Sequence, residues 1–422
     1  MPPLRAAVWM LASPVAMNYL DDIVGAKEYA AGKATALAGV KVIDDTHIAI
    51  TITAPRSYFL GKLTFPTAYA LDKTEVEKGE KIEGAFTITA TNVVGSGPYK
   101  LGSYVRQGKV ILDANADYWA GAPKLKKIER PIILDAKTAR NRYDAGQLDI
   151  VTLEKGDYER DKADAKVSGE IQTFGRAATF YLGLNQTHYA PFKDKRVRQA
   201  FYQAIDIATI QRVVMRGAST PTALMIGPGI NGFQTDAKRL PYDVEAAKKL
   251  LAEAGYPNGF EVAMNCPNDR YVNDGRICQT VAANLSRINV KINLQAETKG
   301  TYFPKILRRD TSFYMLGWTP ATYDSHNALN ALVRCVDDKG AGQFNLGAYC
   351  NPKVDELTLK IQSETDKAKR NAMIKEAFDL HAADVGHIPL HQQALAWGVN
   401  KNVKLVQLAD NFMPFKWMSI EK

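Results

Sequence analysis

The chain has 422 residues, of which 46% are hydrophobic and 23% charged, and its formal net charge is +9. This composition is typical of a globular protein, and no run of about 18 apolar residues is present, which argues against a membrane-spanning helix. The basic residues are spread among 45 acids, so they favour a generally basic surface over a nucleic-acid-binding site. The chain is longer than the number of residues that usually share one hydrophobic core, so we expect two or three lobes.

The first part of the chain predicts small elements around a β-hairpin. Residues 36–53 alternate in hydrophobicity on both sides of a turn at 44–46, which predicts two paired strands. Residues 56–80 are expected to be mainly helical. The Gly-Ser-Gly-Pro stretch at 95–98 breaks the chain sharply, and we place a lobe boundary there.

The next part is expected to form strands around one helix. Residues 99–150 alternate in places, with a helix predicted at 138–145 and a strand at 148–150. Residues 180–185 predict a further strand, near which the chain is expected to cross between lobes.

The clearest periodicity lies in the second half of the chain. A helix between an N-cap at Asp243 and a stop at Gly255 is followed by a strand at 260–264, a helix at 277–288 and a strand at 290–294. This order predicts an α/β lobe with parallel strands. Two more helices are expected, one starting after Asn351 and one at 366–382.

The most informative segment runs from residue 314 to residue 324. Its short apolar run suits a buried strand and ends at Gly317-Trp318, before a polar and aromatic cluster. Gly317 allows a backbone or a ligand to come close, and Trp318 offers a flat surface with one N–H donor. These properties suit a pocket wall; the alternative is a core tryptophan at a strand end.

This segment and several other motifs, in this order, resemble the family 5 extracellular solute-binding proteins, the peptide- and dipeptide-binding receptors of ABC importers. The resemblance runs from about Tyr19 to the end of the chain. The other motifs are residues 95–101, 115–119, 192–200, 246–257, 343–347 and 351–357. The resemblance implies an α/β, two-lobed periplasmic-binding-protein type II fold with an extra small subdomain on the first lobe.

The resemblance also implies a division of the chain. Residues 1–97 would form the small subdomain, 98–184 the first part of the lobe I core, 185–390 lobe II, and 391–422 the segment that returns to lobe I. The lobes would close on a ligand by a hinge near Asn185 and Leu390.

The function implied is that of a substrate-binding subunit, not an enzyme, which binds a small peptide without a cofactor or nucleic acid. Its partners would be the membrane permease subunits of an ABC transporter, and it is expected to be a monomer in the periplasm or outside the cell. A nickel chelate, haem, an opine or a sugar-like solute are alternative ligands. No signal peptide is evident, and the chain is expected to start after the N-terminal segment that family members normally carry.

A free peptide requires a carboxylate for its amine and an arginine for its carboxylate. The family's amine-binding aspartate shortly follows the Gly-Trp pair, but Thr319 stands in that region here and the first acid is Asp324. Arg309, beside Arg308, is the nearest upstream arginine. Other residues that fall where family members line the cleft are Asn141, Tyr181, Trp318, Tyr323 and His391.

An enzyme is the alternative from another class. His381, His387 and His391 raise the hypothesis of a metal-dependent hydrolase, because two histidines four apart on a helix could chelate a metal. However, Pro389 favours an extended segment, on which these two histidines would lie about 13 Å apart. No G-x-S-x-G, P-loop or H-E-x-x-H motif is present, and we assign no metal ligands.

Four cysteines form two local pairs in the sequence, Cys266 with Cys278 and Cys335 with Cys350. Three pairings are possible, and the sequence does not choose among them. The family resemblance implies export, and disulfides persist in exported proteins. A Cys335–Cys350 bond would stabilise the chain by roughly 3 kcal/mol; four free buried thiols are the alternative.

Overall fold

The chain divides into two compact units, which we describe separately. Unit 1 comprises Met1–Thr173 and Ala396–Lys422, and unit 2 comprises Phe174–Leu395. The computed structural model describes residues 17–44, 46–69, 81–82, 85–86, 95–153, 155–337 and 340–421. Within these ranges, none of the helices combines the length and the apolar character needed to cross a bilayer.

The N-terminal part of unit 1 contains the predicted hairpin. Strands β1 (Val40–Val42) and β2 (Ile48–Ile50) pair antiparallel, which confirms the expectation from the alternating isoleucines and valines. A small apolar core beneath them includes Leu20, Ile23 and Phe59. The helices here are α2 (Met17–Leu20), α3 (Ala26–Ala30), α4 (Phe59–Lys62) and η1 (Pro66–Ala68). The mainly helical segment expected at 56–80 is therefore reduced to two short helical pieces within 56–69, and residues 70–80 lie outside the described part.

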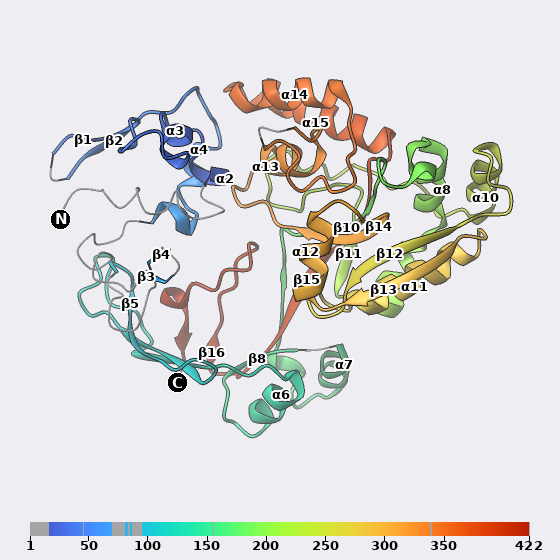
Figure 1. Ribbon diagram of the computed structural model, residues 1–422. Helices are drawn as coiled ribbons and strands as arrows, with labels where there is room; N and C mark the ends of the chain where they lie inside the picture. Colours follow the sequence, from blue (N-terminus) through green and yellow to red (C-terminus); the bar gives the residue numbers. More distant parts are fainter. Residues whose placement is uncertain are drawn as a thin grey trace. The chain divides into compact units, whose positions relative to one another are not determined.

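The remainder of unit 1 is built on short antiparallel sheets (Figure 1). The predicted helix is α6 (Ala136–Asp144), which Asp135 caps by accepting a hydrogen bond from the backbone N–H of Thr138. The other elements are β3 (Lys81–Ile82), β4 (Ala85–Phe86), β5 (Tyr99–Tyr104), β6 (Lys109–Ala114), β7 (Lys127–Pro131), β8 (Ile150–Thr152), α7 (Lys155–Ala163), η2 (Ser168–Glu170), β16 (Val403–Lys404), η6 (Phe415–Trp417) and β17 (Ser419–Ile420).

Unit 2 is organised around a mixed sheet with the strand order β11-β15-β10-β14-β12-β13. Strands β12 and β13 are parallel, as predicted, and β14 is parallel to β12. Strand β10 runs antiparallel to both β14 and β15. The strands are β9 (Ile171–Gly175), which spans the unit boundary, β10 (Thr179–Leu184), β11 (Ser219–Pro221), β12 (Glu261–Pro267), β13 (Lys291–Glu297), β14 (Phe313–Trp318) and β15 (His387–Val399).

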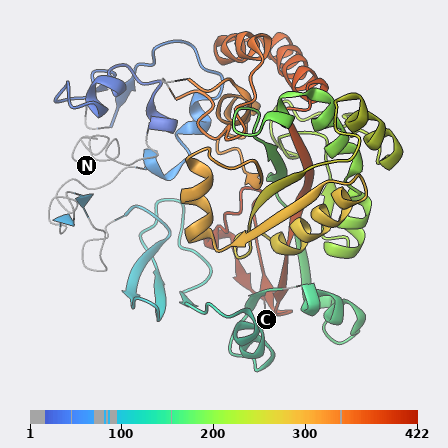
Figure 2. The ribbon, with the colours of Figure 1, turned by 45° about the vertical axis from the view of Figure 1, so that its right-hand side comes forward.

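The helices of unit 2 lie on both sides of these strands (Figure 2). The predicted caps are present, since Asp243 accepts from Ala246 N at the start of α10 and Asn351 accepts from Lys353 N at the start of α14. The helices are η3 (Ala190–Lys193), α8 (Lys195–Ala204), α9 (Ile207–Thr209), η4 (Ile210–Val214), α10 (Val244–Glu253), α11 (Asp274–Ser286), α12 (Lys299–Leu307), α13 (Ser325–Ala328), η5 (Leu329–Val333), α14 (Pro352–Ser363) and α15 (Lys367–Ala383).

The order of strands and helices creates a topological switch point between β12 and β14. Helix α11 connects β12 to β13 in one direction along the sheet, and α12 returns past β12 to β14 in the other. Since such crossovers are right-handed, the two helices lie on opposite faces of the sheet. Ligands of open α/β sheets bind outside the carboxyl ends of strands at such a point. We therefore expect a ligand-binding site at this edge of the sheet.

Candidate functional site

The carboxyl end of β14 carries the Gly317-Trp318 pair. Trp318 pairs with Thr179 at the start of β10. A Cβ atom on Gly317 would lie 2.7 Å from Cε1 of Phe180 and 3.2 Å from Cε1 of Tyr271, so these two rings fill the space that the glycine leaves. The backbone N–H of Gly317 donates to the Tyr271 hydroxyl over 3.1 Å. Gly317 therefore allows aromatic side chains, as well as a backbone, to approach the strand end.

Trp318 is half-buried and held from two sides. Its indole Nε1 donates to Oδ1 of Asn327 over 3.0 Å. Its ring centroid lies 5.0 Å from that of Phe344. The indole is therefore fixed in orientation but not sealed in the core, which suits the predicted pocket wall. Thr319, the next residue, is also half-buried.

The Asp324 carboxylate accepts several hydrogen bonds from residues of unit 2. Arg370 on α15 donates two hydrogen bonds of 2.7 Å to its carboxylate. Its Oδ1 also accepts from the backbone N–H of His326 and caps α13, and its Oδ2 accepts from Asn231 over 3.3 Å. The carboxylate is buried. These contacts give Asp324 a structural role, and we do not propose it as the group that binds a ligand amine.

The other residues near this segment differ in access. Tyr323 is 39% exposed and has a positive φ of 53°. Tyr181 and His391 are fully buried, with the His391 ring edge-on to Phe180 and the Tyr181 ring edge-on to His387. Burial lowers the pKa of His391 to about 3 and raises the pKa of Tyr181 well above its ordinary value. Both rings therefore belong to the buried interior of unit 2.

Two predicted residues lie away from the β14 carboxyl end. Arg309 precedes β14, at the opposite end of the strand from Trp318, and its Nη2 donates to the carbonyl oxygens of Gly342 and Gln343. Asn141 is exposed on α6 and belongs to unit 1. Arg309 thus anchors a loop of unit 2, and Arg308 donates to Asp310 beside it.

The three histidines do not converge. His381 Nε2 lies 2.9 Å from His387 Nδ1 in the buried interior, whereas His391 packs on Phe180 and approaches Gln393. His381 lies on α15, whereas His387 and His391 lie on β15, whose extended form at residues 387–391 was predicted from Pro389. In the described part of the chain, no group of three His, Cys, Asp or Glu side chains could hold a metal ion.

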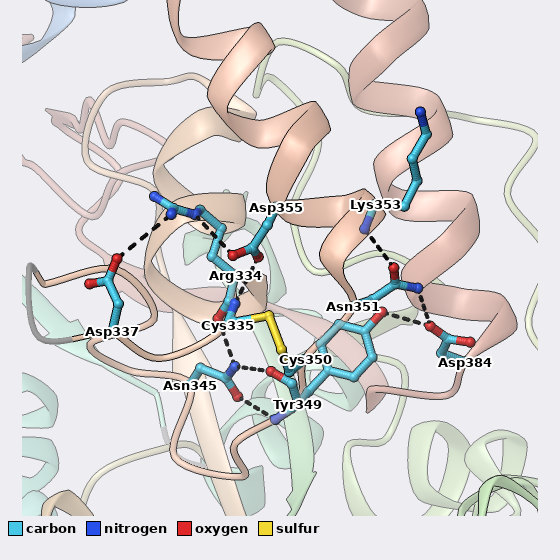
Figure 3. The surroundings of a disulfide bond; sticks show 10 residues. All are labelled: Arg334, Cys335, Asp337, Asn345, Tyr349, Cys350, Asn351, Lys353, Asp355 and Asp384. Carbon is cyan, nitrogen blue, oxygen red and sulfur yellow. Dashed lines mark hydrogen bonds and ion pairs between the residues drawn. A yellow bond between two sulfur atoms is a disulfide. The ribbon is translucent and has the colours of Figure 1, made fainter.

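Both local cysteine pairs form disulfides. Cys266–Cys278 joins the end of β12 to α11, and Cys335–Cys350 closes a loop before α14. Figure 3 shows the second bond, with the backbone N–H of Cys335 donating to Asp355 and the Asn345 side chain bridging to Tyr349. Phe344, which contacts Trp318, lies inside this loop, so the disulfide restrains part of the candidate wall.

Sequence reasoning missed three residues at the same edge of the sheet. Arg270 and Tyr271 follow β12, and Arg176 precedes β10. Because β12 and β14 end at the edge where β10 begins, these residues lie beyond the same edge as Trp318. Their positions directly beside predicted strands were the signal that could have found them.

Comparison with known proteins identifies related chains. A family model described as bacterial extracellular solute-binding proteins, family 5 Middle, matches residues 12–340. The chain is 28% identical over 356 residues to heme-binding protein A of Haemophilus influenzae, covering 81% of this chain and 62% of that protein. It is 25% identical to the oligopeptide-binding protein OppA of Bacillus subtilis, covering 86% and 67%. The chain thus spans about two thirds of these two proteins.

Solved structures share the fold. The murein tripeptide binding protein MppA of Escherichia coli superposes with a TM-score of 0.80 at 24% identity, covering 98% of this chain and 82% of that chain. DppA from Helicobacter pylori, solved with the peptide STSA, gives 0.79 at 21% identity, covering 99% and 82%. The expected α/β periplasmic-binding-protein fold is confirmed.

Proposed function

Because this chain belongs to the bacterial extracellular solute-binding proteins of family 5, we propose that it is the substrate-binding component of an ABC importer and that its ligand is a short peptide. It is a binding protein and not an enzyme. It acts outside the cytoplasmic membrane, in the periplasm or at the cell surface, and delivers its ligand to membrane permease subunits.

The observation that carries this proposal is the set of residues at the topological switch point of unit 2. Gly317 and Trp318 end β14, and Thr319 follows them, at the sheet edge where ligands of such folds bind. A half-buried indole with a fixed orientation accepts varied apolar side chains, and the strand end supplies backbone groups for an extended peptide. Tyr323 completes the ligand-lining set that we propose on this unit.

We propose that ligand binding draws on both units. The chain passes between them at Thr173–Phe174 and again at Leu395–Ala396, whereas the sequence predicted hinges near Asn185 and Leu390. A ligand that contacts both units only in a closed arrangement stabilises that arrangement by its differential affinity. Asn141 of unit 1 remains a proposed ligand contact on this basis.

The names of several relatives and similar structures favour a peptide over other solutes as the ligand. The relatives and structures named above include an oligopeptide-binding protein and two proteins named or solved with peptides. Other relatives are named for haem or glutathione, and one similar structure contains agropinic acid. We therefore keep haem, glutathione and an opine as the ligands against which a peptide is to be tested.

Thermal unfolding against a panel of ligands tests this proposal. Trialanine, glutathione, haemin and agropinic acid are each added at the same molar excess, and the unfolding midpoint is recorded. We expect the largest rise with trialanine. A rise confined to haemin, glutathione or agropinic acid would replace the peptide with that solute, and native mass spectrometry of protein from its own host would weigh what co-purifies.

A further inference from the structure

Two strands of unit 1 each have one unpaired edge. Strand β7 is the last strand of the β5-β6-β7 sheet, and β8 pairs only with β15 in the described part of the chain. Helix α6 connects β7 to β8, a connection that is typical of parallel neighbours in one sheet. The two strands nevertheless belong to different sheets, so neither edge is satisfied by the other.

The hydrogen bonds of β7 identify which of its backbone groups point outward. The N–H of Ile132 donates to the carbonyl of Gly108 at one end of the β6–β7 ladder. Hydrogen-bonded residues alternate along an antiparallel ladder, so every second residue of β7 bonds to β6. The register therefore turns the N–H and carbonyl groups of Lys127 and Glu129 away from β6. These two residues present donors and acceptors along the outer edge of β7.

Strand β8 has the same arrangement on its free side. The N–H of Leu153 donates to the carbonyl of Ala396 at the end of the β8–β15 ladder. By the same alternation, Ile150 and Thr152 direct their backbone groups away from β15. An unpaired strand edge is a ready template for another strand, and proteins normally cover or blunt such edges.

A cavity of about 1000 Å³ lies against both strands. Every residue of β7 (Lys127–Pro131) and of β8 (Ile150–Thr152) lines it. Apolar side chains from the last part of the chain, including Trp397, Phe415 and Met418, complete the lining. The indole Nε1 of Trp397 is buried with no hydrogen-bond partner among the described residues. Two rows of backbone donors and acceptors with apolar walls suit an extended polypeptide.

The cavity lining has an excess of positive charge. Its four basic and two acidic residues are Lys109, Lys127, Arg130, Arg142, Glu129 and Asp149. Glu129 is already paired with Lys109 and Lys127. Arg130 lies 5.5 Å from the centroid of the Phe415 ring, and neither it nor Arg142 forms an ion pair with a described residue. An occupant with acidic side chains therefore complements this lining.

We infer that this cavity is a docking site for one β-strand of another polypeptide, with apolar side chains along the strand and acidic side chains at its ends. The strand inserts between β7 and β8 and hydrogen-bonds to both free edges. Its acidic side chains meet Arg130 and Arg142. A second copy of this chain fits less well, because its own β7 edge is basic and like charges on neighbouring strands repel. The docking site lies within unit 1 and does not depend on the ligand proposed for unit 2.

Hydrogen exchange resolved to single amides tests the docking site. The probe is the capped peptide acetyl-Glu-Val-Thr-Val-Thr-Val-Glu-amide. Its control has N-methylated valines, which remove backbone donors but keep the side chains and the charge. In the protein alone we expect fast exchange at Lys127, Glu129, Ile150 and Thr152. The probe should slow exchange of these four amides by about tenfold or more, and the control should not. Binding of the probe at unit 2 would leave these amides unchanged.

A matched pair of variants tests the contribution of β7. Glu129→Pro removes an outward donor of β7, whereas Glu129→Ala removes the same side chain and keeps that donor. We expect only Glu129→Pro to weaken the slowing that the probe causes at Ile150 and Thr152. Thermal unfolding checks both folds, and if Glu129→Pro is the less stable, the comparison of the two peptides decides instead.

Three results would overturn the docking site. The first is slow exchange of the four amides in the protein alone, since this chain or a second copy would then already cover the edges. The second is equal slowing by the probe and by its N-methylated control, which would show apolar adsorption without strand pairing. The third is the absence of any slowing by the probe.

Discussion

Arg370 on α15 and Asp324 before α13 form a buried, bidentate ion pair, in which both hydrogen bonds are 2.7 Å long. Arg370 also donates through Nε to the carbonyl of Ile361 at the end of α14. The pair therefore ties α13, α14 and α15 together directly after the Gly317-Trp318 strand. It fixes the segment that follows the candidate wall.

Asp324→Asn is expected to destabilise the protein by about 3–5 kcal/mol, because it leaves the Arg370 guanidinium buried without its counter-charge. Urea titration followed by circular dichroism measures this. The control is Asp379→Asn, which breaks an exposed i,i+4 pair with Lys375 on the same helix and should cost at most about 0.5 kcal/mol. Equal effects of the two variants would show that the buried pair contributes no more than a surface one.

The disulfide Cys335–Cys350 is expected to stabilise both the fold and the ligand site. Replacing both cysteines by serine should cost about 3 kcal/mol, since 15 positions separate the two residues. It should also weaken ligand binding, because Phe344 in this loop contacts Trp318. Replacing Cys266 and Cys278 should also lower stability and affinity, because the loop that they close carries Tyr271, whose hydroxyl accepts from the N–H of Gly317. Unchanged ligand affinity after replacement of Cys335 and Cys350 would show that their loop does not position Trp318.

Gly317→Ala is expected to destabilise the protein by about 1–3 kcal/mol through overpacking. The added methyl group would meet the rings of Phe180 and Tyr271, which contact each other and have little room to move. The control is Gly300→Ala on α12, where a Cβ atom meets nothing within 4 Å. Denaturant titration compares the two, and an unchanged midpoint for Gly317→Ala would show that the rings relax at no cost.

Stability is expected to fall below neutral pH because of buried neutral histidines. Burial lowers the pKa of His381 to about 4 and of His391 to about 3, and it lowers the pKa of His387 well below its ordinary value. The unfolded chain binds protons at these sites below about pH 6.5 and the folded chain does not. Stability from each site is therefore complete above that pH and decreases by about 1.4 kcal/mol per pH unit below it.

His391→Gln tests this linkage. Urea titrations at pH 7, 6 and 5 give the slope of the unfolding free energy against pH. The variant should unfold with about one fewer proton taken up between pH 6 and 5 than wild type. An unchanged slope would mean that His391 titrates alike in both states.

Much of the fold was predictable because its signals are local. In the β12-α11-β13 unit, the hydrophobic residues alternate along the strands and recur at helical spacing along the helix. The capping residues Asp243 and Asn351 mark the starts of two further helices, within four residues of each start. The sharp end of β14 at Gly317-Trp318 was likewise visible. Those features are set by neighbours in the chain, and the structure confirms them.

The roles of charged side chains could not be predicted in this way. The sequence suggested Asp324 as a ligand-binding carboxylate because it is the first acid after Trp318. Its partner Arg370 is 46 residues away in the sequence, on another helix. Arg176 and Arg270 lie near each other only because β10 and β12 flank β14. Such pairings depend on strand order, which periodicity does not contain, and they determine which charges remain free for a ligand.

Calorimetric titration of trialanine into the protein, with mass spectrometry of the recovered peptide, tests the central claim that unit 2 presents a solute-binding site at its β12–β14 edge. We predict saturable binding of one peptide per chain, recovery of the peptide intact, and a large loss of affinity in Trp318→Ala. Unchanged affinity in Trp318→Ala, or recovery of hydrolysed peptide, would contradict it.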